Sequence, residues 1–205
     1  AGTALAPPGL DPANKVIAAS NDNNLHSMTA SAGARNYKPG GATGTTGGPV
    51  QTRPAVVSQG DTQLIDCDSV TLGNQPCDLA YVGSNDGRVY AFNAITGQVI
   101  WSTPAAGSLG SLVAAGGMIQ GGISAQLKSF AGVSFTPTTD LLFVGTRELS
   151  ATANKVYALN GSTGAIVWTF SPGNMDAVNS TPAVDYANNV IWVSTLSNLG
   201  GQPSL

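Results

Sequence analysis

The chain has 205 residues, of which 26 are Gly, 12 are Pro and only 9% are charged, whereas about 25% is usual in soluble domains. Ser, Thr and Asn together number 53, and there are four Lys and a single Glu, Glu148, so residues suited to exposed helix faces are scarce. This composition argues against helical bundles and coiled coils and predicts an all-β fold. No apolar run approaches the roughly 20 residues of a membrane span, and a net charge of -3 argues against nucleic acid as a partner.

The N-terminal part contains a weak copy of a pattern that is clearer later in the chain. PGLDPANKVIAAS, from Pro8, has the Pro, Asp, Ala and Asn spacing of TPAVDYANNVIWVST, which runs from Thr181 to Thr195. Both patterns predict a strand, a turn and a return strand. In the following SNDNNLHSMTASAGARNY, Gly33 and Tyr37 take the places that Gly and Trp occupy in later copies.

The only two cysteines, Cys67 and Cys77, lie in a polar, turn-rich segment between two apolar runs. A hairpin there would bring them together, and we expect a disulfide, which would stabilise the fold by about 3 kcal/mol in the chain-entropy model. A metal site would need more ligands than these two and His26, the single histidine. With the low charge, a disulfide indicates an extracytoplasmic location. The chain begins at Ala1 without a signal-peptide pattern, and we expect that any such peptide has been removed.

Two longer segments repeat clearly. LAYVGSNDGRVYAFNAITGQVIW ends at Trp101, and LLFVGTRELSATANKVYALNGSTGAIVW ends at Trp168. Apolar residues alternate in both with the period of two that is typical of strands. The residues that recur with identical spacing are Ala91, Asn93, Thr96, Gly97 and Trp101 in the first copy and Ala158, Asn160, Thr163, Gly164 and Trp168 in the second.

A strand, turn and return strand precede each such segment, as RPAVV from Arg53 and GVSFTPTTDLLFVGT from Gly132 indicate. Each unit is thus predicted to be four short antiparallel strands, and such sheets repeated along a chain are blades of a β-propeller. We predict one partial propeller over residues 1–205, with about three and a half blades. Their approximate bounds are 7–52, 53–131, 132–180 and an incomplete 181–205. Because propellers close with four to eight blades, we expect further sequence or another chain to supply the rest.

The pattern Ala-x-Asn-x-x-Thr-Gly-x-x-x-Trp resembles the tryptophan-docking motif of the quinoprotein (PQQ-like) propeller family, whose usual third position is Asp. The resemblance implies that Trp101 and Trp168 pack between blades. Enzymes of the family hold pyrroloquinoline quinone at the propeller axis, and many use calcium, a carboxylate base and adjacent cysteines. Cys67 and Cys77 are not adjacent, and no carboxylate here matches the base. We therefore predict no catalytic, cofactor-binding or metal-binding residue in this chain. PQQ and calcium are expected as cofactors only if the chain is a fragment of such a dehydrogenase.

The remaining residues that could bind a metal or act in catalysis have no recognisable partners in the sequence. Asp22 and Asp86 stand beside Asn residues in predicted hairpin turns, which is more typical of turns than of calcium sites. His26 is expected at a loop edge, and Glu148 is expected to be solvated, although it could act as an acid or base.

Strand parity places three long loops at one end of the blades, and this end is the predicted binding surface because loops on a rigid scaffold usually carry function. They begin at Lys38, Thr103 and Thr146. Within the second, GSLVAAGGMIQGGISAQLKSFAG could be a lid, or an edge strand followed by a packed connector.

Three functions remain open. The first is a non-catalytic, extracytoplasmic module with a structural or protein-interaction role. The sequence thus disfavours enzymatic activity without deciding the question. The second is a fragment of a PQQ-dependent alcohol or sugar dehydrogenase whose catalytic residues lie elsewhere. The third is a carbohydrate-binding surface protein, supported by polar loops and spare aromatic residues such as Tyr37.

Overall fold

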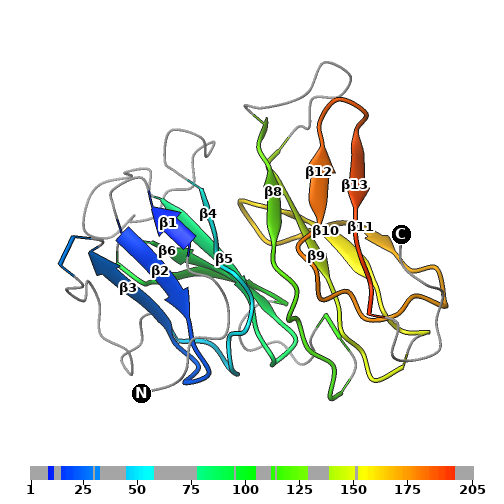
Figure 1. The fold of residues 1–205 in the computed structure, drawn as a ribbon, viewed down its shortest axis with the longest axis horizontal. Coiled ribbons are helices and arrows are strands. Elements are labelled where there is room, and N and C mark those ends of the chain that lie inside the picture. Colours follow the sequence, from blue (N-terminus) through cyan, green and yellow to red (C-terminus); the bar gives the residue numbers. More distant parts are fainter. Residues whose placement is uncertain are drawn as a thin grey trace.

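The computed structural model describes residues 9–11, 15–29, 31–32, 45–57, 78–94, 96–104, 112–113, 115–128, 139–150 and 152–196. Within these residues there are thirteen strands in four antiparallel sheets. The sheets follow one another in chain order, from blue at one side of the molecule to red at the other (Figure 1). The fold is all-β, as the composition predicted.

The first sheet contains β1 (Gly9–Asp11), β2 (Lys15–Ala19) and β3 (Leu25–Thr29) in that order. These are the first three strands predicted for this unit. Its predicted fourth strand, with Gly33 and Tyr37, lies outside the described residues.

The second sheet is a complete four-stranded meander. It contains β4 (Ala55–Val57), β5 (Leu79–Gly83), β6 (Val89–Asn93) and β7 (Val99–Thr103), each paired with the next. The residues between β4 and β5 that include Cys67 and Cys77 lie outside the described part of the chain, so the disulfide stays a prediction.

The third sheet contains β8 (Ser124–Gln126), β9 (Leu141–Gly145), β10 (Val156–Asn160) and β11 (Ile166–Phe170). Its last pair repeats the second sheet closely: the register shifts between Ala158 and Leu159, and likewise between Ala91 and Phe92. The same repeat in the sequence thus produces the same local irregularity in both sheets.

The third sheet begins earlier than the sequence predicted. Ser124 pairs with Phe143 and Gln126 with Leu141, so β8 is the partner of β9, and the predicted boundary between residues 131 and 132 is wrong. A three-residue strand of small and polar residues has no apolar alternation, and this is why the pattern missed it. Of the two interpretations of the long insertion, the strand is present, but it is the first strand of the third sheet and not an additional one, and the packed connection precedes it.

The fourth sheet is a hairpin of β12 (Ala183–Asp185) and β13 (Val190–Trp192), as expected for an incomplete unit. The first strands of neighbouring sheets contact one another in the order β1, β4, β8 and β12. They therefore surround a common line, which is the arrangement of blades around a propeller axis.

The core lies between the sheets rather than inside any one of them. Along β5, Ala80 and Val82 pack in a cluster with the first sheet, while Leu79 and Tyr81 pack in a cluster with the third. Every residue of β5 and β6 is buried, because a middle strand of a blade has a neighbouring sheet on each face. The clear alternation seen in one-sided sheets is replaced by nearly continuous apolar runs.

Candidate functional site: the loop end

The turns between the second and third strands of each sheet and the connections between sheets gather at one end of the molecule, on its lower side in Figure 1. We call this the loop end. It consists of the described residues of the turns 20–24, 84–88 and 146–155 and of the connections 45–52, 112–123 and 171–180. The described residues of the predicted loops that precede β4 and β8 or follow β9 lie here, but the stretch predicted from Thr103 to Ala131 also contains β8 and Lys128, and Lys128 lies at the opposite end.

Each connection is hydrogen-bonded to the turn of the preceding sheet in the same way. The amide of Val50 donates to the carbonyl of Ser20 at 3.1 Å, Ile119 to Ser84 at 3.2 Å and Val178 to Thr146 at 3.0 Å. The three donors occupy the same place, five residues before the next strand begins. Each connection is therefore fixed to the preceding blade by a backbone hydrogen bond.

A second set of bonds joins each connection to its own sheet. Asn85 donates to the carbonyl of Pro49, Arg147 to Met118 and Leu196 to Ala177, each at 2.9 Å between backbone nitrogen and oxygen. Since each connection bonds to two sheets, all four sheets are joined in series at this end. The loop end is thus built on a rigid backbone.

Two glycines permit this close approach. Ile119 is fully buried against Gly83, and Val178 is fully buried against Gly145. A Cβ atom on either glycine would overlap the facing side chain. Glycine is needed here for close packing.

A row of polar side chains crosses the loop end from the first sheet to the third. Gln51 Nε2 donates to Asn21 Oδ1 at 3.1 Å, Gln120 Nε2 donates to Gln51 Oε1, and Arg147 Nη1 donates to Gln120 Oε1. We call these four residues the amide row. No sequence motif predicts the amide row, although Gln51 and Gln120 share a position four residues before a strand.

The two candidate aspartates of the turns are used in hairpin contacts. Asp22 accepts the Asn24 amide at 3.1 Å and lies 3.0 Å from His26 Nε2. Burial raises the pKa of Asp22, but hydrogen bonds from Ser20 and His26 and the positive charge of protonated His26 outweigh burial, so this pKa lies below its usual range.

Asp86 accepts the Arg88 amide at 3.0 Å and the hydroxyl of Tyr90. Burial, followed by the bond to Asp86, raises the pKa of Tyr90 to about 12. No group of three or more His, Cys, Asp or Glu able to hold a metal occurs within the described ranges.

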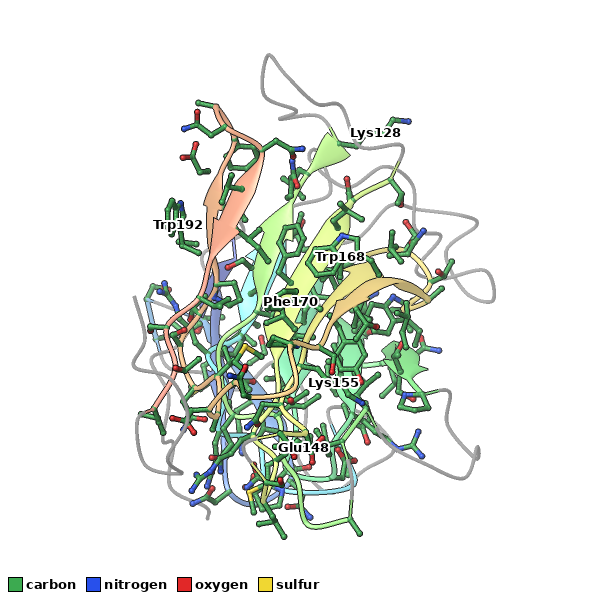
Figure 2. The ribbon with its side chains drawn as sticks, turned by 90° about the vertical axis from the view of Figure 1, so that its right-hand side faces the viewer. Lys128, Glu148, Lys155, Trp168, Phe170 and Trp192 are labelled. Carbon is green, nitrogen blue, oxygen red and sulfur yellow. The ribbon has the colours of Figure 1, made fainter. Side chains whose placement is uncertain are left out.

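Glu148 is buried, with 4% of its surface exposed, so the expectation of a solvated carboxylate is wrong. The turn that carries it folds back on itself: Asn154 Oδ1 accepts the Glu148 amide at 2.7 Å, and Asn154 Nδ2 donates to the Met175 carbonyl at 2.8 Å. These two hydrogen bonds of Asn154 close the turn, and no pattern in the local sequence predicts them. Figure 2 shows Glu148 at the end opposite to Lys128, which follows β8.

The motif residues at the opposite end shape the turns between third and fourth strands. Gly97 and Gly164 have positive φ angles of 76° and 71°. Asn93 Oδ1 accepts the Thr96 amide at 3.0 Å, and Asn160 Oδ1 accepts the Thr163 amide at 3.1 Å. Ala91 and Ala158, fully buried, leave room for the neighbouring sheets.

The two motif tryptophans have different surroundings. Trp101 Nε1 donates to the Gly161 carbonyl of the next sheet at 3.0 Å, and a Cβ atom on Gly164 would overlap the Trp101 ring. Trp168 stacks at a tilt on Phe143, with ring centroids 5.8 Å apart, and keeps 38% of its surface exposed. Beside it a cavity of about 170 Å³ opens between the third sheet and the fourth hairpin.

Sheets of up to four antiparallel strands, joined in series with their first strands around a common line, define the chain as a segment of a β-propeller. Two solved structures share this fold. BamB from Moraxella catarrhalis has a TM-score of 0.55 and 13% identity, and the match covers 94% of this chain and 47% of that one. Quinohemoprotein alcohol dehydrogenase from Comamonas testosteroni has a TM-score of 0.56 and 15% identity, with 95% and 29% covered.

Residues 6–120 match the PQQ-like repeat family model described as "Outer membrane protein assembly factor BamB", and the chain belongs to this family. The predicted membership of the PQQ-like propeller family is thereby confirmed. Among curated proteins, tetrathionate hydrolase of Acidithiobacillus ferrooxidans is 31% identical over 122 residues, which are 57% of this chain and 22% of that protein. The chain thus spans less than half the length of each of these three relatives. No helix within the described ranges is long and apolar enough to span a membrane.

Proposed function

We propose that the chain is a non-catalytic, extracytoplasmic propeller module whose loop end is a platform for a protein partner, and that further sequence or another chain completes its propeller. The observation that carries this proposal is the series of connections that bond to two sheets each. A surface held in this way is preorganised, so binding costs little ordering of loops.

The chemistry of the surface suits a polypeptide partner. The amide row presents hydrogen-bond donors and acceptors, with Gln51 and Gln120 on two connections between Asn21 and Arg147 on two turns. Beside it, Leu149 exposes 75% of its surface and offers an apolar contact. Transient protein interfaces commonly combine polar groups with a few apolar contacts. The name of the matched family model, an assembly factor, supports the same class of function.

The test is site-specific photo-crosslinking of the full-length protein in its native cells. A photoreactive residue replaces the exposed Arg147 at the loop end, and a second variant carries it at Lys128 at the opposite end as the matched control. We expect one protein to be captured from position 147 and not from position 128. Absence of any product from position 147, in a variant with unchanged thermal unfolding, would contradict the proposal.

A second candidate function is hydrolysis of a polythionate by the larger protein to which this segment would belong. The observation in its favour is the 31% identity to tetrathionate hydrolase over 122 residues. Loss of tetrathionate in the presence of the purified full-length protein, and its persistence in the presence of heat-denatured protein, would establish this activity.

The quinone-dependent dehydrogenase remains a further candidate, favoured by the fold shared with the alcohol dehydrogenase of Comamonas testosteroni. Dye-linked alcohol or sugar oxidation that requires both added PQQ and calcium would support it. A carbohydrate ligand rests on polar loops and on Tyr37, which lies outside the described residues; silence on a glycan array would count against it.

A further inference from the structure

The turn between β10 and β11 contains Asn160 and Gly161, the only Asn-Gly pair in the sequence. Asparagine is a chemically labile residue, because its side-chain carbon Cγ lies within reach of the backbone nitrogen of the next residue. A glycine at that next position hinders the approach of the two atoms least, since it lacks a Cβ atom. The matching turn of the second sheet has Ala94 after Asn93, so the reactive pair occurs in one of the two motif turns.

The peptide group that joins Asn160 to Gly161 is held on both sides. Its nitrogen donates to the carbonyl of Asp140 at 2.8 Å, and its carbonyl oxygen accepts the amide of Gly164 at 2.8 Å. The side-chain Oδ1 of Asn160 accepts two further backbone amides of the turn, at 2.8 Å and 3.1 Å. Both groups that would react are therefore fixed by hydrogen bonds.

The second sheet holds the same turn from outside. The carbonyl of Gly161 accepts hydrogen bonds from the hydroxyl of Tyr81 at 3.1 Å and from Trp101 Nε1 at 3.0 Å. A Cβ atom on Gly161 would lie 3.1 Å from the Cβ of Asp140 and 3.5 Å from the Tyr81 hydroxyl, so the close packing favours glycine here. The contact between the two sheets thus favours the residue that makes Asn160 reactive, and it also restrains the reaction.

We propose that Asn160 is a site of intramolecular deamidation, and that the contact between the second and third sheets blocks the reaction while the contact is closed. The backbone nitrogen of Gly161 attacks Cγ of Asn160 and loses its proton, the Cγ–Nδ2 bond breaks, Nδ2 leaves with that proton as ammonia, and a five-membered imide ring forms. Water then opens the ring at either of its two carbonyl groups and gives aspartate or isoaspartate. In sum, one side-chain amide and one water become one carboxylate and one ammonium ion, without oxidation or reduction.

Ring closure is incompatible with the folded turn. The imide nitrogen carries no hydrogen, so the bond from Gly161 to the Asp140 carbonyl is lost. The Cγ of Asn160 also moves toward this nitrogen, which disturbs the two hydrogen bonds to Oδ1. Since each of these bonds contributes to stability, we expect the reaction in molecules whose turn has opened.

The two products have different consequences for the fold. Aspartate leaves the backbone unchanged and keeps an oxygen for the two turn amides, and its charge strengthens these hydrogen bonds. Isoaspartate carries the backbone through the former side chain and adds one backbone atom before Gly161. The carbonyl of Gly161 is then displaced from Tyr81 and Trp101, so the second and third sheets no longer pack in the same way. Modification of Asn160 thus records an opening of the contact, and isoaspartate makes the opening permanent.

The first experiment incubates the full-length protein in mildly alkaline buffer, with and without urea that unfolds it. Peptide mass spectrometry measures aspartate and isoaspartate at positions 160 and 93. We expect conversion at position 160 to be severalfold faster in urea. Asn93 has the same bond from its Oδ1 to a turn amide but is followed by Ala94, so it is the matched control and should react much more slowly in urea. Equal rates at position 160 with and without urea, or equal rates at the two positions in urea, would overturn the proposal.

The second experiment tests the role of the contact between the sheets. Tyr81→Phe and Trp101→Phe each remove one donor to the Gly161 carbonyl, and Trp168→Phe is the matched control outside this contact. Without urea, at a temperature at which circular dichroism shows each variant folded, we expect conversion at position 160 to rise severalfold in the first two variants and to stay unchanged in the third.

In urea all three variants should react at the wild-type rate, because the chemistry of the Asn-Gly pair is the same. A different rate in urea would overturn the assignment of the effect to the folded contact. Unchanged conversion without urea in both Tyr81→Phe and Trp101→Phe, or an equal rise in Trp168→Phe, would overturn the proposal.

Discussion

The interface between the second and third sheets and the interface between the third and fourth differ although their sequences repeat. Trp101 and Trp168 follow the same motif, and the strands before them share the same register shift. Yet Thr103 is 8% exposed, whereas Phe170, its counterpart, is 53% exposed. The repeat thus determines the local backbone, while the burial of the motif depends on the sheet that comes next. Among the described residues, a turn of the next sheet covers Trp101, and none covers Trp168.

The largest effect is expected from removing the indole ring at the covered interface. Trp101→Ala should lower the free energy of unfolding of the 205-residue chain by about 3–5 kcal/mol, because the partly buried ring packs against the core cluster and its Nε1 donates a hydrogen bond to the next sheet. Trp168→Ala should cost less, about 2 kcal/mol in the same chain, because 38% of the surface of Trp168 already contacts water. Urea denaturation measures both. Equal losses would show that the two interfaces do not differ in the way the burial indicates.

Loop-end packing offers the next largest test. Gly145→Ala places a methyl group against Val178 and should destabilise the fold by about 1–3 kcal/mol, the usual range for overpacking. Adding Val178→Ala to Gly145→Ala should recover part of that loss beyond the sum of the single effects. Strict additivity in thermal and urea unfolding would contradict the proposed close contact.

The hydrogen bonds to Gly161 provide a finer comparison. Tyr81→Phe and Trp101→Phe each remove one donor from this carbonyl, and each should cost about 1 kcal/mol from the lost bond, with some added packing cost for Trp101→Phe. The double variant should lose more than the sum, since the buried carbonyl is then without either donor. Trp168→Phe is the control and should change the stability of the 205-residue chain little. A double-mutant cycle with no coupling would contradict this prediction.

The smallest effect is a dependence on pH in the first sheet. Because the pKa of Asp22 is lowered in the folded state, its stabilising contribution is present above the ordinary value of 3.8 and is lost as the pH falls through the folded value. The pair with His26 is partly exposed, so the contribution should be at most about 0.5 kcal/mol. Urea unfolding between pH 5 and pH 2.5 should show a slightly larger loss for the wild type than for Asp22→Asn. A steeper loss in the variant would contradict the sign.

Much of the fold followed from patterns of short range. Period-two alternation located β5, β6, β9 and β10, and the Thr-Gly pair located the turn at Gly97, because a positive φ angle is a local requirement. The strand β8 did not follow, since three small residues carry no alternation and its assignment comes from pairing with β9. The amide row was missed for a similar reason, since Gln51 and Gln120 meet only when two connections lie side by side.

The sequence by itself determined the all-β class, the repeated blade and the turns that the motif residues make, because these depend on backbone dihedral angles and on the alternation of side chains within a few residues. Only the tertiary structure decided that Glu148 is buried, that the connections bond to two sheets each and that Trp101 is covered while Trp168 is open. Burial and cross-sheet bonding depend on which segments become neighbours in space. Two copies of one motif can therefore have the same conformation and different surroundings.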